Sequence, residues 1–86
     1  MTKKSVKIQL DGGLEARPIA VLVQVASQYE STIYLETGDK RVNAKSIMGM
    51  MTLGLKAGER MTIEATGKDE EAAIEGMEKY ITGQEV

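Results

Sequence analysis

Two short segments of the chain combine residue types that are able to do chemistry. The first runs from Leu14 to Pro18, where Glu15 and Arg17 precede or open a predicted helix. The free N–H groups and the dipole of a helix N-terminus attract an anion, and Glu15 can itself be that anion, paired with Arg17. The second is Ser46, which follows Lys45 and precedes an apolar run. Serine is a common helix N-cap, so each segment has a structural interpretation beside a functional one.

The composition removes most other chemistry. The 86 residues include no Cys and no His, which excludes a thiol or histidine nucleophile, a disulfide and any Cys/His metal site. We expect no metal, no cofactor and no enzyme activity. Eleven Lys and Arg against thirteen Asp and Glu give a net charge of −2, and Phe and Trp are absent. Direct binding to nucleic acid is therefore not expected, since neither a basic surplus nor stacking platforms are present.

The hydropathy pattern contains neither a leader nor a membrane span. The amino-terminal lysines are followed by the alternation of Val6, Ile8 and Leu10 with polar residues, not by the continuous apolar run of a signal peptide. No run approaches the ~20 apolar residues of a membrane-spanning helix. The sequence therefore predicts a cytoplasmic protein with no membrane partner.

The periodicity predicts seven elements in one domain covering residues 1–86. Alternation of two indicates strands, and apolar residues three and four apart indicate helices. The order is strand, helix, strand, strand, helix, strand, helix, which gives an α+β domain with a four-stranded sheet and helices on one face. The elements are a strand at Val6 to Leu10, a helix at Ala16 to Tyr29, a hairpin of Thr32 to Glu36 with a short strand around Val42, a short helix after Ser46, a strand at Arg60 to Thr66, and a helix after Asp69.

Details of the last strand and helix follow from the same patterns. In the strand, Met61, Ile63 and Ala65 are expected to face inward and Glu64 outward. Asp69 is expected to cap the last helix through its side chain. Gly76 within that helix costs about 1 kcal/mol relative to Ala, and the sequence offers no reason for it.

Two predicted helices carry more apolar side chains than one buried face of a helix can cover. The short helix after Ser46 is too small to bury its whole apolar run, because a buried stripe spans only about 100° or somewhat more. If Met50 and Leu53 point inward, the other apolar residues are exposed. In the first helix, Val21 falls opposite Ile19 on a polar side. Apolar side chains on a polar face indicate a docking surface. The predicted partner-binding residues are Arg17, Ala20, Val21, Gln24, Ile47, Met48 and Met51.

Two longer segments in register point to a known family. They are GGLEARPIAVLVQ, Gly12 to Gln24, and VNAKSIMGMMTLGL, Val42 to Leu55. At this separation and in this order of elements they closely resemble the HPr phosphocarrier family of the bacterial sugar phosphotransferase system, over essentially the whole chain. The resemblance implies an open-faced β-sandwich: a four-stranded antiparallel sheet of spatial order 1-4-2-3, covered on one face by three helices.

The resemblance also implies that the carrier chemistry is lost. In that family a histidine immediately before the Ala-Arg-Pro motif takes phosphate from enzyme I and passes it to sugar-specific transporter components. Here Glu15 occupies that position, while Arg17 and Pro18 remain. Glu15 and Arg17 thus form a degenerate phosphocarrier site, and histidine phosphotransfer is not expected.

The regulatory serine of the family does match, at Ser46. In Gram-positive bacteria, HPr kinase/phosphorylase phosphorylates this serine, and the product is a corepressor for catabolite control protein A, CcpA. A chain without the histidine but with the serine resembles the catabolite-repression branch, Crh, which has glutamine where this chain has Glu15. A phosphate at a helix N-terminus meets free N–H groups, so it should be accommodated without unfolding.

The sequence therefore predicts a regulatory protein of carbon catabolite repression, with HPr kinase/phosphorylase and CcpA as partners. Two alternatives remain open: a carrier that forms an acyl phosphate on Glu15, and an interaction module that is never modified. A homodimer, with exchange of the first strand between two chains, is also left open.

Overall fold

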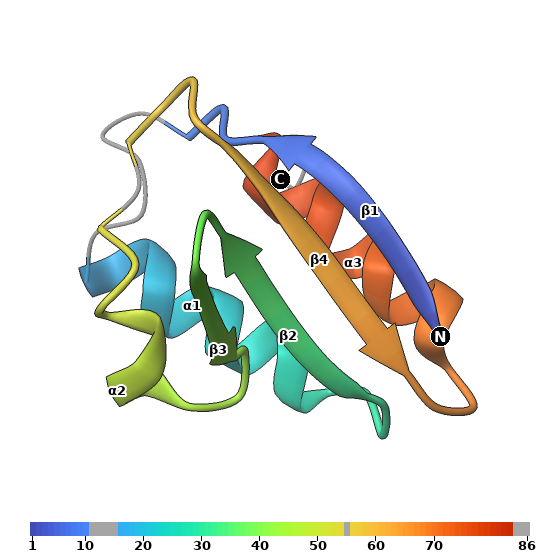
Figure 1. Ribbon diagram of the computed structural model, residues 1–86. Coiled ribbons are helices and arrows are strands. Elements are labelled where there is room, and N and C mark those ends of the chain that lie inside the picture. Colours follow the sequence, from blue (N-terminus) through green and yellow to red (C-terminus); the bar gives the residue numbers. More distant parts are fainter. Residues whose placement is uncertain (11–15, 55, 84–86) are drawn as a thin grey trace.

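The computed structural model describes residues 1–10, 16–54 and 56–83, and its elements follow the predicted order (Figure 1). The first helix ends two residues earlier than predicted, and the other helices and the hairpin lie where the periodicity placed them. The elements are β1 (Thr2–Lys7), α1 (Ala16–Ser27), β2 (Thr32–Thr37), β3 (Lys40–Asn43), α2 (Ile47–Met50), β4 (Arg60–Thr66) and α3 (Glu70–Ile81).

The four strands form one antiparallel sheet of order β1-β4-β2-β3. The predicted fold class, an α+β open-faced sandwich, is confirmed. The placement of the first strand was wrong: β1 begins at Thr2 and ends at Lys7, because its backbone pairs with β4 from Thr2↔Ala65 to Lys7↔Arg60. The alternation seen in the sequence is nevertheless real, since Val6 and Ile8 are buried.

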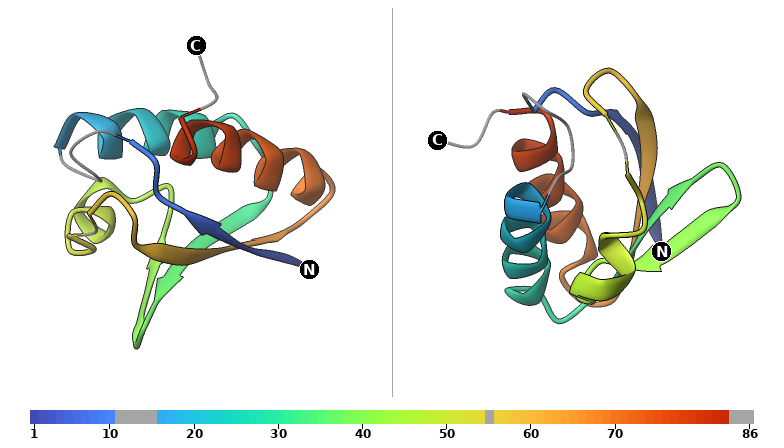
Figure 2. Two further views of the ribbon diagram at one scale, coloured as in Figure 1. Left: turned by 90° about the horizontal axis from the view of Figure 1, so that it is seen from above. Right: turned by 90° about the vertical axis from the view of Figure 1, so that its left-hand side faces the viewer.

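The core lies between the sheet and the two long helices. Figure 2 shows α1 and α3 side by side on one face of the sheet, with α2 at the end of the sheet near α1 and β3. Each long helix turns one apolar stripe toward the strands, as the helical spacing predicted. The buried apolar residues are Val6, Ile8, Ile19, Leu22, Ala26, Ile33, Leu35, Ala44, Met50, Leu53, Met61, Ile63, Ala65, Ala73, Ile74, Met77 and Ile81.

The opposite face of the sheet carries a charged cluster that covers Glu64. This residue lies on the face away from the helices, as predicted, but it is only 4% exposed. Arg41 of β3 covers it: its guanidinium lies 3.9 Å above the Tyr34 ring and donates to both Glu64 (3.1 Å) and Glu36 (3.0 Å). Burial on its own would raise the pKa of Glu64, but the hydrogen bond and charge of Arg41 lower it overall.

Gly76 has a structural reason that the sequence did not reveal. A Cβ at this position of α3 would lie 2.2 Å from the Tyr29 hydroxyl oxygen and 3.0 Å from the ring carbon that bears it. Tyr29 directly follows the last turn of α1, so its ring fills the space that a side chain on α3 would take. The glycine is required for the close packing of α1 on α3.

No helix in residues 1–10, 16–54 and 56–83 is long and apolar enough to cross a membrane.

Candidate functional site

Ser46 stands at the end of a short loop whose backbone is held from several sides. Asn43 accepts twice within the loop: its side-chain oxygen from the Lys45 N–H (2.8 Å) and its carbonyl from the Ser46 N–H (3.0 Å). Between them, Ala44 is buried and its N–H donates to the carbonyl of Ile33 in β2 (2.8 Å). The loop is therefore a closed turn attached to the sheet.

The Ser46 side chain is exposed and caps α2, as predicted. Its hydroxyl oxygen accepts the Gly49 N–H at 3.3 Å, and its backbone is extended, as expected of an N-cap. The next turn closes through the Met50 N–H, which donates to the Ser46 carbonyl (3.0 Å). The hydroxyl hydrogen itself is not used in any contact of the described residues, so the group faces solvent as a free donor.

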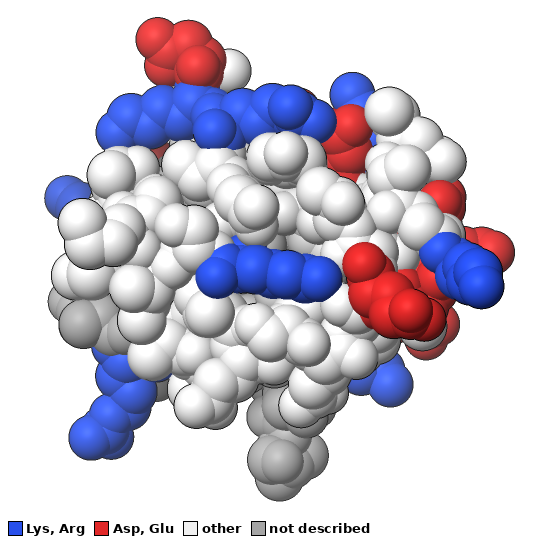
Figure 3. All heavy atoms as spheres, turned by 90° about the horizontal axis from the view of Figure 1, so that it is seen from below, with Lys and Arg blue, Asp and Glu red and all other residues white. Residues whose placement is uncertain are grey.

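Apolar side chains surround this serine on the solvent side. α2 buries Met50, and Leu53 just beyond it is also buried. The remaining apolar residues of the segment are open to solvent, as the stripe argument predicted: Ile47 is 46%, Met48 79% and Met51 56% exposed. Seen from below Figure 1, the molecule is largely uncharged except for one Lys or Arg side chain that crosses the middle of this face, and the other charged side chains lie mainly toward its rim (Figure 3).

Residues of α1 continue this surface, since α1 lies beside α2. Arg17 and Gln24 are exposed, whereas Ala20 and Val21 are half-buried. The structure thus places the predicted partner-binding residues of both helices at the surface or partly at it. Glu15, the other half of the predicted degenerate phosphocarrier site, lies outside the described residues.

Lys45 has a role that the sequence analysis missed. It was noted only as the residue before Ser46, but its ammonium nitrogen donates to the carbonyl of Tyr29 at 2.7 Å, at the end of α1. One signal was present in the sequence: α1 has no basic residue in its last turn, where a cation is favourable. At the other end of α2, Lys40 makes a similar bond, to the carbonyl of Thr52 (2.7 Å).

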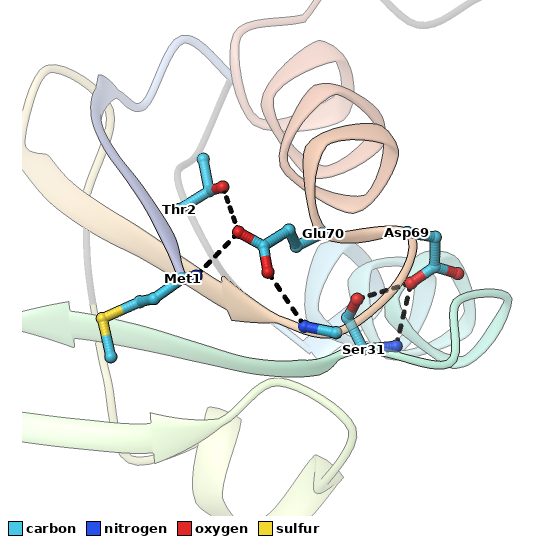
Figure 4. Close-up of polar contacts among 6 residues, drawn as sticks. Met1, Thr2, Ser31, Asp69 and Glu70 are labelled. Atoms are coloured by element: carbon cyan, nitrogen blue, oxygen red, sulfur yellow. Dashed lines mark hydrogen bonds and ion pairs between the residues drawn. The ribbon is translucent and has the colours of Figure 1, made fainter.

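The turn between α1 and β2 is itself fixed by α3. The Asp69 carboxylate accepts from the Glu30 N–H, the Ser31 N–H (both 2.9 Å) and the Ser31 hydroxyl. Figure 4 shows the two bonds from Ser31. The hydrogen bond from the Ser31 hydroxyl, with those from the two amides, lowers the pKa of Asp69. Asp69 is the N-cap residue of α3, as predicted, but its side chain makes no capping bond to the helix, because the carboxylate is engaged 38 residues away in sequence.

Glu70, the first residue of α3, binds the start of β1 instead. Its carboxylate accepts from the Thr2 hydroxyl, the N-terminal ammonium (2.9 Å) and the Gly67 N–H (3.1 Å) (Figure 4). These contacts, led by the Thr2 hydroxyl, lower the pKa of Glu70 to about 2. Farther along, Lys4 donates to Glu78 of α3 at 2.8 Å. Polar contacts therefore tie β1 to α3, and within β1 only Val6 is buried.

The arrangement places an exposed hydroxyl, that of Ser46, beside exposed apolar side chains. Within the described ranges, no three carboxylate side chains come together as they would to hold a metal ion.

Comparison with known proteins identifies the family. Residues 2–83 match the family described as "PTS HPr component phosphorylation site". The HPr-like protein Crh of Bacillus subtilis is 43% identical over 81 residues, which cover 94% of this chain and 95% of that protein. The crystal structure of an HPr from Thermoanaerobacter tengcongensis has a TM-score of 0.90 and 43% identity, with both chains fully covered.

A second solved structure is the Bacillus subtilis Crh, a dimer with a swapped domain, at a TM-score of 0.80 and 41% identity over 100% of this chain and 99% of that one. The fold and the site thus define an HPr-like protein, in a class of phosphocarrier or regulatory proteins that are not enzymes. The chain belongs to the HPr family of the phosphotransferase system and is of the HPr and Crh kind.

Proposed function

We propose that this protein is phosphorylated on Ser46 by HPr kinase/phosphorylase in the cytoplasm, and that the phosphorylated form is a corepressor of CcpA. The observation that carries the proposal is the position of Ser46: an exposed hydroxyl at the start of α2, with Ile47, Met48 and Met51 exposed around it. The similarity to Crh supports it, because that protein is named for catabolite repression.

A phosphate on Ser46 would act as an added charge and not as a disruption of the fold. The hydroxyl points to solvent, so about −1.5 to −2 charges enter without burial of an anion. The Gly49 N–H already donates to that oxygen position and remains a donor for a phosphate oxygen. A partner with an arginine next to an apolar recess would then bind charge and apolar side chains together.

Carrier activity at Glu15 is the less favoured function. A carboxylate can form an acyl phosphate, but it is shorter and less rigid than the imidazole it would replace. Glu15 lies outside the described residues, and of the pair only Arg17, which is exposed, is described.

The modification can be tested directly with purified kinase and ATP. The expected result is one added phosphoryl group in the intact mass, mapped by fragment spectra to Ser46 and absent from Ser46→Ala. Ser5→Ala is the matched control, because Ser5 is an exposed serine on β1, remote from α2. A phosphate that maps elsewhere, or that persists in Ser46→Ala, contradicts the proposal.

We also propose a second copy of this chain as a partner, through exchange of β1. The swapped dimer of the similar Crh suggests it. In this chain β1 is an edge strand that contributes one buried side chain, Val6, and is otherwise held by backbone pairing and by Glu70 and Glu78. Light scattering across a range of protein concentrations should show a dimer, and a monomer at every concentration would refute this part.

A further inference from the structure

The loop that carries Ser46 is bonded to the end of α1 by the side chain of the residue next to the serine. The Lys45 ammonium donates to the Tyr29 carbonyl at 2.7 Å, across 16 residues of sequence. Tyr29 follows the last turn of α1, where helix carbonyls lack partners and the dipole end is negative. A charged donor to such a carbonyl forms one of the stronger hydrogen bonds found in proteins.

The carbonyl that receives Lys45 belongs to a turn with little freedom. On one side of it, the Glu30 and Ser31 amides are bound by the Asp69 carboxylate (Figure 4 shows the Ser31 contacts). The Tyr29 ring lies against α3, where Gly76 leaves room for it. The Tyr29 carbonyl is thus held against α3 by contacts on both sides of it. Through its bond to this carbonyl, Lys45 holds the neighbouring Ser46 in place relative to α3.

The two elements on either side of the loop also hold it. Asn43 closes the turn onto Lys45 and Ser46, and as the last residue of β3 it pairs with Tyr34 of β2. The buried Ala44, bonded to Ile33, ties the loop to the sheet, and the buried Met50 holds α2 beyond it. The Lys45 ammonium adds a bond to the end of α1, which the bonds to the sheet do not provide.

We propose that Lys45 is a positioning residue for the modification of Ser46, which it keeps in one orientation for the phosphorylating enzyme through its bond to the Tyr29 carbonyl. This inference rests on the proposed function of Ser46. In this arrangement the lysine charge is directed toward the protein, and its contribution is made before any partner binds. Loss of the bond lowers the fraction of molecules whose loop is ready to bind, and the apparent affinity falls by that fraction.

The test compares Lys45→Met with Lys4→Met. Methionine keeps a stem of similar length and loses the ammonium group, and both variants lose one positive charge and one lysine hydrogen bond. Lys4 bonds to Glu78 on α3, far from α2, so Lys4→Met controls for charge. With HPr kinase/phosphorylase and ATP, Lys45→Met should raise KM about tenfold with kcat nearly unchanged, and Lys4→Met should leave both constants as they are. An unchanged KM in Lys45→Met overturns the proposal.

Hydrogen exchange in the free, unmodified protein separates positioning from direct contact with the enzyme. The Ser46 and Met50 amides, which close the loop and the first turn of α2, should exchange about tenfold faster in Lys45→Met and at the wild-type rate in Lys4→Met. A raised KM with unchanged exchange means that Lys45 touches the enzyme, and the positioning role is then wrong. If the wild type is not modified at Ser46 at all, the proposed function fails, while the exchange rates alone still decide whether Lys45 orders the loop.

Discussion

Replacing Gly76 by alanine should destabilise this protein, although the same change stabilises most helices. Gly76 lies inside α3, where alanine is better than glycine by about 1 kcal/mol on propensity alone. Here the new methyl carbon would lie 2.2 Å from the Tyr29 hydroxyl oxygen, 3.0 Å from the ring carbon that bears it and 3.2 Å from a neighbouring ring carbon. A phenol ring is rigid, so the contact is relieved only if the whole ring moves away from α3.

The two effects have opposite signs, and their sizes decide the outcome. Forcing extra volume into a packed site typically costs 1–3 kcal/mol, about 2 kcal/mol at the centre of that range, against the gain of about 1 kcal/mol from propensity. A net loss of about 1 kcal/mol is expected, which for a domain of this size lowers Tm by about 4–8 °C. If the contact between the new methyl group and the Tyr29 ring causes the lower Tm, replacing Tyr29 by a residue without the ring must abolish that decrease.

Thermal unfolding of four proteins tests this: wild type, Gly76→Ala, Tyr29→Leu and the double variant. Gly76→Ala should lower Tm in the wild-type background and raise it in the Tyr29→Leu background. Gly49→Ala is the matched control, because a methyl group there meets its neighbours only at ordinary contact distances of 3.5 Å or more. If Gly76→Ala raises Tm when Tyr29 is present, the packing explanation is refuted.

Three further results are expected. Enzyme I with phosphoenolpyruvate should fail to load labelled phosphate onto this chain, because Glu15 replaces the nucleophile; loading at the rate of an ordinary HPr would establish the acyl-phosphate alternative. Met48→Ala should weaken binding of the phosphorylated protein to CcpA about tenfold with Tm unchanged. Met50→Ala, at a fully buried site, should instead lower the free energy of unfolding by about 2–5 kcal/mol. A Met48→Ala protein that melts early and binds normally would show that Met48 belongs to the core. The pKa of Glu70 is lowered from 4.5 to about 2 in the folded protein, so its contribution to stability is present above pH 4.5 and is lost as the pH falls toward 2. Glu70→Gln should flatten the pH dependence of the free energy of unfolding over that range, and equal slopes for both proteins would show that the contacts of the Glu70 carboxylate do not stabilise the fold.

Periodicity predicted the elements because burial acts on one face of each. The alternation in β4 and the helical spacing in α3 both follow from the need to cover the sheet, and both were read correctly. The bounds of β1 were predicted wrongly because its first residues do not show an alternation of buried and exposed side chains. They are polar residues at the edge of the sheet, and they belong to the strand because their backbone pairs with β4, which the local sequence pattern does not reveal.

Polar contacts between residues far apart in the chain could not be predicted from the sequence. The Asp69 carboxylate was expected to cap its own helix, but it accepts hydrogen bonds from the amides of the α1–β2 turn instead. Glu64 was expected only to face outward, and its burial was not foreseen, because Arg41 of β3 reaches over Tyr34 of β2 to pair with it. The exposure of Met48 was predictable, because a single short helix cannot bury a continuous apolar run. The role of Lys45 was not, since it depends on a carbonyl from another element.

The most direct test of the central claim is a titration of CcpA with this protein before and after stoichiometric phosphorylation on Ser46. Because the phosphate supplies the charge that a repressor recognises beside the apolar side chains of α2, the phosphorylated form should bind at least about tenfold more tightly, a difference of about 1.4 kcal/mol. The unmodified protein and Ser46→Ala treated with kinase should bind equally weakly. Equal affinity of CcpA for the phosphorylated and unmodified forms would contradict the account.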